Sequence, residues 1–232
     1  MPALLQTSPY LKYIILASLK PEKTPEDIMY PVITEFLGEL KAPRERFVIY
    51  PQLALPWKPD DAKDKRKEIP DFAIGNFDFA NAPHFKVRVG AEVKRAIPVM
   101  LDLPEPSAIE NNEFVKIAFH GLFYQAEDQA KSAMKGSSNL TVPMPFLLFV
   151  GPYWTSVQFT AFNDAQLSVR THKPSTSGDF IEATNAQARL MSRPKRRRIY
   201  LLGTAASRAE MERVIATTDL AAQPLIGAAL SF

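Results

Sequence analysis

Apolar residues recur along this chain with two spacings, one typical of helices and one typical of strands. The segment 24–27 reads TPED, in which threonine can cap a helix and proline can occupy its first position. An apolar stripe at helical spacing follows it: Ile28, Val32, Phe36 and Leu40. A second stripe runs from a capping residue, Asn111 or Asn112, to about Lys135. The pattern therefore predicts one helix near 24–41 and a longer one ending near 135.

Short apolar or alternating runs predict strands between and after these helices. The expected strands cover residues 47–50, 69–74, 85–93, 146–150, 157–162 and 198–202. The charged segment 58–68 is expected to be a loop, and a last helix is expected from Ser207 to about Thr217. This order predicts an α/β fold in which helices flank a mixed central sheet. Neither a repeat nor a low-complexity linker divides the chain, so residues 1–232 are read as a single domain.

The composition restricts the chemistry that this domain can carry. The chain has 232 residues, no cysteine and 3 histidines, which excludes disulfide scaffolds, thiolate zinc sites and His-rich metal centres. Any metal must therefore be held by oxygen atoms. No apolar run approaches the ~20 residues of a membrane span, so we expect an intracellular protein with no membrane partner.

Positive charge is concentrated near the C-terminus. The net charge is only +3, yet residues 189–213 contain eight basic and two acidic side chains. Such a patch can meet phosphate groups. The run Pro194-Lys195-Arg196-Arg197-Arg198 is also typical of a nuclear-localisation signal, which makes a nuclear location the alternative. A solvated surface remains an equally good reading of the same charges.

The strand expected at 85–93 orients its own side chains, because alternate residues of a strand point to opposite faces. One face is wholly apolar: Phe85, Val87, Val89, Ala91 and Val93. The other face carries Lys86, Arg88, Gly90, Glu92 and Lys94. In the preceding strand Phe72 and Ile74 are expected in the core, which turns Asp71 the other way. We therefore expect Asp71, Glu92 and Lys94 to come together.

The two segments Pro70-Asp71 and Glu92-Val93-Lys94 resemble the PD-(D/E)xK signature of restriction-endonuclease-like nucleases. The predicted order of elements agrees with the αβββαβ core of that family over about 24–165. The basic strand and helix at about 189–232 form a C-terminal extension without a counterpart. The resemblance implies a nuclease that depends on Mg²⁺ (or Mn²⁺) and acts on DNA, less readily on RNA.

Carboxylates suit this chemistry because Mg²⁺ is a hard cation that prefers oxygen ligands and shares them with substrate phosphates. The resemblance makes Asp71 and Glu92 the metal ligands, and it makes Lys94 the residue that orients the attacking water. Members of the family often add an acid from the first helix, for which Glu26 fits best and Glu35 and Glu39 are alternatives. Glu26 could equally be a first-turn acid that complements the helix dipole.

Further candidates would contact the nucleic acid. Gln129 falls inside the apolar arc of the long helix and Gln125 at its edge, so each either faces the nucleic acid or satisfies a sheet carbonyl. Lys86 and Arg88 are expected to meet phosphates on the face of Glu92. The opposite side of the long helix carries residues expected in solvent, namely His120, Tyr124 and Lys131.

Two other hypotheses remain open at this stage. In one, the chain is a nuclease-like module that binds nucleic acid or a protein without cutting. In the other, Glu92 and Lys94 are an exposed cross-strand ion pair, which would contribute only ~0–1 kcal/mol to stability. The sequence leaves the oligomeric state undetermined.

Overall fold

The mixed α/β fold expected from the sequence is confirmed in the computed structural model. The structure describes residues 15, 29–38, 48–53, 55–56, 67–68, 70–78, 84–135, 143–160, 162–168 and 199–218. Its helices are α2 (Met29–Gly38), α3 (Pro106–Ile109), α4 (Glu113–Lys135), α5 (Asp164–Ser168) and α7 (Ala205–Ala216), with a 3-10 turn, η4 (Pro98–Met100). Its strands are β1 (Val48–Pro51), β2 (Leu55–Pro56), β3 (Lys67–Glu68), β4 (Phe72–Asp78), β5 (His84–Lys94), β6 (Met144–Val150), β7 (Tyr153–Phe159) and β8 (Tyr200–Leu201).

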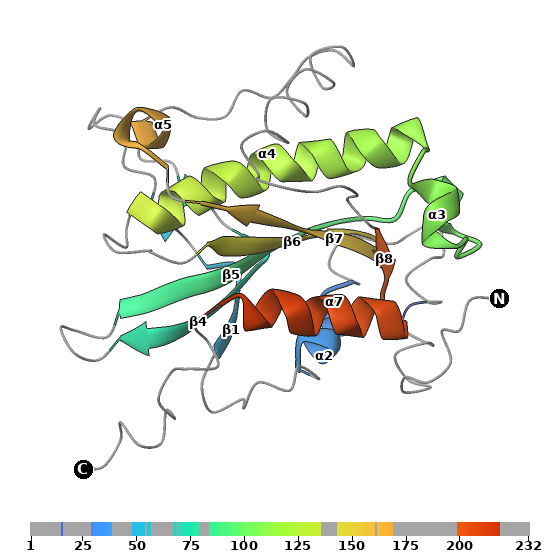
Figure 1. Cartoon of the computed structure of the whole chain (residues 1–232), viewed down its shortest axis with the longest axis horizontal. Coiled ribbons are helices and arrows are strands. Elements are labelled where there is room, and N and C mark those ends of the chain that lie inside the picture. The colour runs from blue at the N-terminus through green and yellow to red at the C-terminus, as the bar shows by residue number, and fades with distance from the viewer. Residues whose placement is uncertain are drawn as a thin grey trace.

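A six-stranded mixed sheet forms the centre of the fold, in the order β1-β4-β5-β6-β7-β8. All neighbouring strands pair antiparallel except β5 and β6, which are parallel. A parallel pair needs a long crossover, and α4 provides it. Figure 1 shows α4 running back across the sheet, in the direction opposite to β5 and β6.

Helices cover the sheet on both faces. Phe123 of α4 packs against Phe159 of β7, with ring centroids 5.6 Å apart. Trp154 points to the other side of β7, where it meets Phe36 of α2 at 6.1 Å and donates to the Ser207 hydroxyl of α7 at 2.7 Å. We call these the α4 face and the α7 face; Figure 1 shows α4 on one side of the sheet and α7 on the other.

Local sequence signals account for where the helices begin. The Asn112 side chain accepts hydrogen bonds from the backbone N–H groups of Phe114 (3.0 Å) and Val115 (3.3 Å), which caps α4 as expected. Thr204 caps α7 by accepting from the Ser207 backbone N–H at 3.2 Å. This last helix therefore begins slightly before the predicted Ser207.

Three predictions about the strands were wrong. The strand expected at 69–74 begins at Phe72 and continues to Asp78, so that Pro70 and Asp71 precede it. The strand expected at 157–162 begins at Tyr153, directly after the turn at Gly151, whose φ is +54°. Because both faces of β7 are covered, its first residues lack the clear alternation of a half-exposed strand. Lys67–Glu68, expected in a loop, pairs with Leu55–Pro56 as a short antiparallel hairpin.

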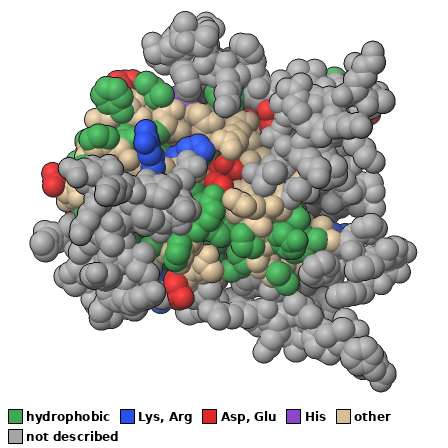
Figure 2. Space-filling model, turned by 180° about the vertical axis from the view of Figure 1, so that it is seen from behind, with side chains coloured by type: hydrophobic (Ala, Val, Ile, Leu, Met, Phe, Trp, Pro, Cys, Tyr) green, Lys and Arg blue, Asp and Glu red, His purple; other side chains and the backbone are tan. Residues whose placement is uncertain are grey.

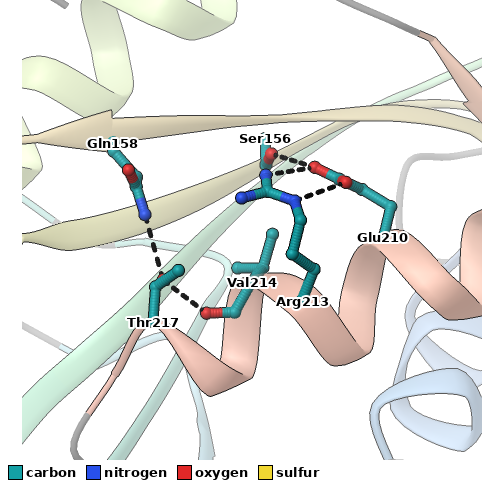
Figure 3. A network of polar contacts seen from close by, with 6 residues as sticks. All are labelled: Ser156, Gln158, Glu210, Arg213, Val214 and Thr217. Carbon is teal, nitrogen blue, oxygen red and sulfur yellow. Dashed lines mark hydrogen bonds and ion pairs between the residues drawn. The ribbon is translucent and has the colours of Figure 1, made fainter. Parts of the chain in front are cut away.

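The C-terminal strand β8 belongs to the same sheet, and the C-terminal helix α7 packs against that sheet. β8 pairs with Tyr153 and Trp154 of β7, which makes it one of the two edge strands, with β1 at the other edge. Figure 3 shows two polar contacts that join β7 to α7: Ser156 donates to Glu210 at 3.1 Å, and Gln158 donates to Thr217 at 3.0 Å. Within α7, Arg213 also donates to Glu210. Most of the basic segment, residues 189–198, lies outside the described residues.

None of the helices within the described residues has both the length and the apolar character needed to span a bilayer.

Candidate functional site

Asp71 lies immediately before β4, where three elements meet its polar atoms. Its Oδ2 accepts the backbone N–H of Val93 on β5 at 2.7 Å, and its Oδ1 accepts the hydroxyl of Tyr30 on α2. Its backbone carbonyl accepts the N–H of Gln52, just after β1, at 3.0 Å. Pro70 is a suitable predecessor because it has no N–H to place in the ladder. The carboxylate is therefore fixed at the end of the sheet, beside the segment that carries Glu92.

Glu92 is fully buried, with 0% of its surface exposed. It points to the α4 face, where it accepts a hydrogen bond from the side-chain amide of Gln129. Its second oxygen, Oε2, is buried and has no hydrogen-bond partner among the described residues. Glu92 is thus not half of an exposed ion pair, and the purely structural hypothesis for Glu92 and Lys94 is wrong in this respect.

This environment disfavours the ionised form of Glu92. Burial raises its pKa from 4.5 to about 8, and the negative charge of Asp71 acts in the same direction. The hydrogen bond from Gln129, the positive charge of Lys94 and the backbone of Asp71 each lower the pKa and offset part of the rise. The charges of Asp71 and Lys94 therefore both act on Glu92, as expected if the three side chains lie close together.

Lys94 ends β5, two residues beyond Glu92 and on the same side of the strand. It is half-buried, and its backbone carbonyl accepts the N–H of Gly151 at 2.7 Å, which ties the end of β5 to the end of β6. Glu92 and Lys94 therefore lie at the carboxyl ends of two parallel strands, β5 and β6, which is the usual place for ligand sites in α/β sheets.

The two glutamines expected to face the site lie on α4 at different depths. Gln129 is buried against Glu92, whereas Gln125 is half-buried one turn earlier. Because α4 runs opposite to β5, the earlier turn is displaced toward Lys94 (Figure 1). Gln129 therefore donates to the buried Glu92 carboxyl, and Gln125 lies nearer the carboxyl end of β5.

A β-bulge interrupts the alternation of β5. Ile74 of β4 pairs with Val89, but the next residue, Gly75, pairs with Val87, so that Arg88 is an extra residue in β5. From Val89 to Lys94 the side chains of β5 point to the predicted faces. From Phe85 to Val87, before the bulge, they point to the faces opposite to those predicted.

The bulge changes the position of the basic residues. Lys86 pairs with Asn76, and cross-strand partners share a face. Asn76 lies on the face of Ile74, which is the α7 face, so Lys86 is not on the face of Glu92 as expected. Arg88 donates to the Asn76 side chain at 3.2 Å and so reaches toward the same partner.

The first helix contributes a hydroxyl to the site rather than a described acid. Glu26 and Glu39 lie outside the described residues. Glu35 is exposed, and at 100° per residue it is about 140° around α2 from Tyr30. Tyr30 was not among the sequence candidates; the only signal for it is that it follows Glu26 by about one turn of the same helix.

The predicted polar side of α4 is partly buried. Tyr124 and Lys131 are 4% and 5% exposed, so the prediction that they face solvent was wrong. Lys131 forms an ion pair with Glu127 at 3.0 Å and lies 5.6 Å from the ring of Phe162. The chain after β7 therefore covers a helix face that looks solvent-exposed on a helical wheel.

The described residues include no group of three or more acidic, histidine or cysteine side chains able to hold a metal. Asp71 and Glu92 form a pair. The pair nevertheless suits a hard divalent cation, because both ligands are oxygens and the buried Glu92 Oε2 lacks a described partner. A cation there would favour the ionised carboxylate that burial now opposes.

Comparisons with family models, with curated proteins and with solved structures find no match for this chain. Functional conclusions therefore rest on the residues themselves. Figure 2, a view from behind, shows basic and acidic side chains side by side near the middle of that face. Charges of both signs thus reach the surface together in the described part of the molecule.

Proposed function

We propose that this protein is a metal-dependent nuclease that hydrolyses phosphodiester bonds in DNA, with RNA as the second choice of substrate. One observation carries the proposal. A buried acid, Glu92, is influenced electrostatically by a second acid, Asp71, and by a cation, Lys94, at the carboxyl end of a parallel strand. Strongly shifted acids of this kind concentrate at functional sites.

The order of elements gives independent support. Leaving aside the β2–β3 hairpin, the η4 turn and the short helix α3, the elements α2, β1, β4, β5, α4 and β6 follow one another in the order αβββαβ. The resemblance to restriction-endonuclease-like proteins rests on that order and on the motif residues. Asp71 before the second of these strands and Glu92 in the third are the positions that the resemblance requires.

Each residue has a distinct role in the proposed reaction. Asp71 and Glu92 would hold Mg²⁺ or Mn²⁺, with Glu26 as a third ligand proposed from sequence alone. When bound, the metal lowers the pKa of a coordinated water and withdraws charge from the scissile phosphate. Lys94 would orient the water or stabilise the negative charge that develops on the phosphate. Gln129 would keep Glu92 oriented through its amide.

A nucleic-acid contact is proposed on the α4 side of the strand that bears the site. Gln125, displaced toward Lys94, is the closest candidate for a contact to the strand being cut. Lys86 and Arg88 are not proposed for this role, because the bulge directs them toward Asn76 and away from the face of Glu92. The basic segment 189–198 adds a further phosphate-binding candidate by its charge.

The proposal can be tested by cleavage of DNA in Mg²⁺ and Mn²⁺. Asp71→Asn and Lys94→Gln should each reduce the rate by about 10²–10⁴-fold, the usual cost of losing a catalytic group. Lys116→Gln removes the same charge from an α4 lysine that is 42% exposed and paired with Glu113, and serves as the matched control. Cleavage at one equal rate by all four proteins would refute the proposal.

A binding module without activity is the second candidate. The favouring observation is that burial raises the pKa of Glu92 to about 8, which favours the neutral carboxyl without any cation. Such a module would bind DNA equally well in EDTA and would gain no thermal stability from Mn²⁺. A metal-dependent nuclease would show a rise in Tm on addition of Mn²⁺, which Asp71→Asn would abolish.

A further inference from the structure

Tyr30 connects helix α2 to the proposed metal-binding carboxylate. Its hydroxyl donates to Oδ1 of Asp71. Its ring packs edge-on against Phe72, the residue after Asp71, with centroids 5.0 Å apart and planes inclined by 67°. Through its ring and its hydroxyl, Tyr30 thus joins α2 to two successive residues at the start of β4.

The other oxygen of Asp71 is held from a different direction. Oδ2 accepts the backbone N–H of Val93, on the strand that carries Glu92 and Lys94. One donor therefore comes from α2 and the other from β5, and together they restrict rotation of the carboxylate about its own bonds. A carboxylate oxygen can accept more than one contact, so each Asp71 oxygen retains capacity for a cation or water.

We propose that Tyr30 is a positioning residue for the metal site, acting through Asp71. This inference rests on the proposed function. Tyr30 holds Oδ1 so that Asp71 and Glu92 can share one cation without a preceding rearrangement of Asp71. In this protein the first helix thus orients a ligand, whether or not Glu26 of the same helix is itself a ligand.

The expected size of the effect follows from comparable residues. Groups that orient a metal ligand typically change metal affinity by 10–100-fold when they are removed. The loss should appear in metal binding itself, and in the metal concentration needed for cleavage. The rate at saturating metal should change less, because Tyr30 does not contact the reacting atoms in this proposal.

The test is Mn²⁺ binding to the full-length protein, measured by titration calorimetry or by electron paramagnetic resonance. Tyr30→Phe, which keeps the ring and removes the hydroxyl, should weaken Mn²⁺ binding by about 10–100-fold. Tyr50→Phe is the matched control, since Tyr50 undergoes the same change on β1 where its side chain is 44% exposed. It should bind Mn²⁺ as the wild type does.

Packing and positioning can be separated with a second variant. Phe72→Leu disturbs the ring contact while leaving the Tyr30 hydroxyl in place, and it should lower Tm yet weaken Mn²⁺ binding less than Tyr30→Phe. Equal Mn²⁺ affinity in Tyr30→Phe and wild type would overturn the inference while leaving the proposed function standing. So would an equal loss in Phe72→Leu. Failure of the wild type to bind Mn²⁺ would overturn the proposed function, and the inference with it.

Discussion

Two glutamates in this protein occupy similar places and behave in opposite ways. Glu92 lies between β5 and α4, and Glu210 lies between α7 and β7. Burial raises the pKa of Glu92 to about 8. Burial also acts to raise the pKa of Glu210, but the hydrogen bonds and charge of Arg213, with the Ser156 hydroxyl, bring it below its usual value.

Their partners explain the difference. Arg213 donates to both oxygens of Glu210, at 2.8 Å and 2.6 Å, and Ser156 adds a third hydrogen bond at 3.1 Å (Figure 3). Glu92 accepts one hydrogen bond, from the side-chain amide of Gln129, and its Oε2 has no hydrogen-bond partner among the described residues. The acid with satisfied oxygens fastens a helix to the sheet. The acid with an open oxygen is the one suited to bind something else.

The largest expected effect concerns the pH dependence of stability without metal. Since the folded pKa of Glu92 is raised, its carboxyl stabilises the fold fully below pH 4.5, and this contribution is lost as pH rises to about 8. The loss is at most about 5 kcal/mol. Glu92→Gln stays neutral and should flatten the profile measured by urea unfolding in EDTA at pH 5 and pH 8.5.

Glu210→Gln provides the contrast for that measurement. The folded pKa of Glu210 is lowered, so its contribution is present above the unfolded pKa and is lost on acidification. Both variants should therefore match wild type at low pH, where each glutamate is protonated, and depart from it in opposite directions at higher pH. Glu92→Gln should become more stable than wild type, and Glu210→Gln less stable. If the stability of wild type and of Glu92→Gln changed with pH in the same way, the raised pKa of Glu92 would be contradicted.

A medium effect is expected for two buried serines, one on each helix. Ser207 of α7, 0% exposed, accepts the Trp154 indole N–H, so Ser207→Ala should cost about 1–3 kcal/mol by leaving that donor unpaired. Ser132 of α4, 2% exposed, has a hydroxyl without a partner among the described residues. Ser132→Ala should leave the free energy of unfolding unchanged or raise it in the same urea experiment. If Ser132→Ala and Ser207→Ala lowered that free energy equally, the buried hydroxyls of α4 and α7 would not differ as described.

The smallest expected effect is for Arg213→Gln. The Arg213 side chain is 58% exposed, and exposed ion pairs contribute only ~0–1 kcal/mol. The variant should leave Tm within a few degrees of wild type, as measured by calorimetry, while returning the pKa of Glu210 toward its usual value in an NMR titration. A large drop in Tm would mean that this pair within α7 contributes far more to stability than exposed ion pairs do.

Much of this arrangement could be predicted from the sequence, because the informative patterns are local. Asn112 and the apolar stripe after it are sufficient to place α4. The alternation that ends at Lys94 is regular from Val89 onward, so it correctly puts Glu92 and Lys94 on one side. Zero cysteine likewise directed attention to oxygen ligands.

The remaining features depend on contacts between distant segments. The bulge at Arg88 arises from pairing with β4, and periodicity cannot reveal it. Tyr30 looks like an ordinary helical aromatic until α2 is packed against Phe72. Lys131 looks exposed until Phe162, from another part of the chain, lies beside it.

The parallel pairing of β5 with β6 has a consequence for the order of assembly. β1, β4 and β5 form one antiparallel unit, β6 and β7 form another, and only the β5–β6 ladder joins the two across α4. Pairing between segments so far apart in the chain is slow because the intervening loop must first be closed. Glu92 and Lys94 lie on that seam. Asp71, Glu92 and Lys94 all belong to the first unit, whereas Gln129 reaches Glu92 only when α4 packs on the sheet, so the enclosure of Glu92 would be completed late in folding.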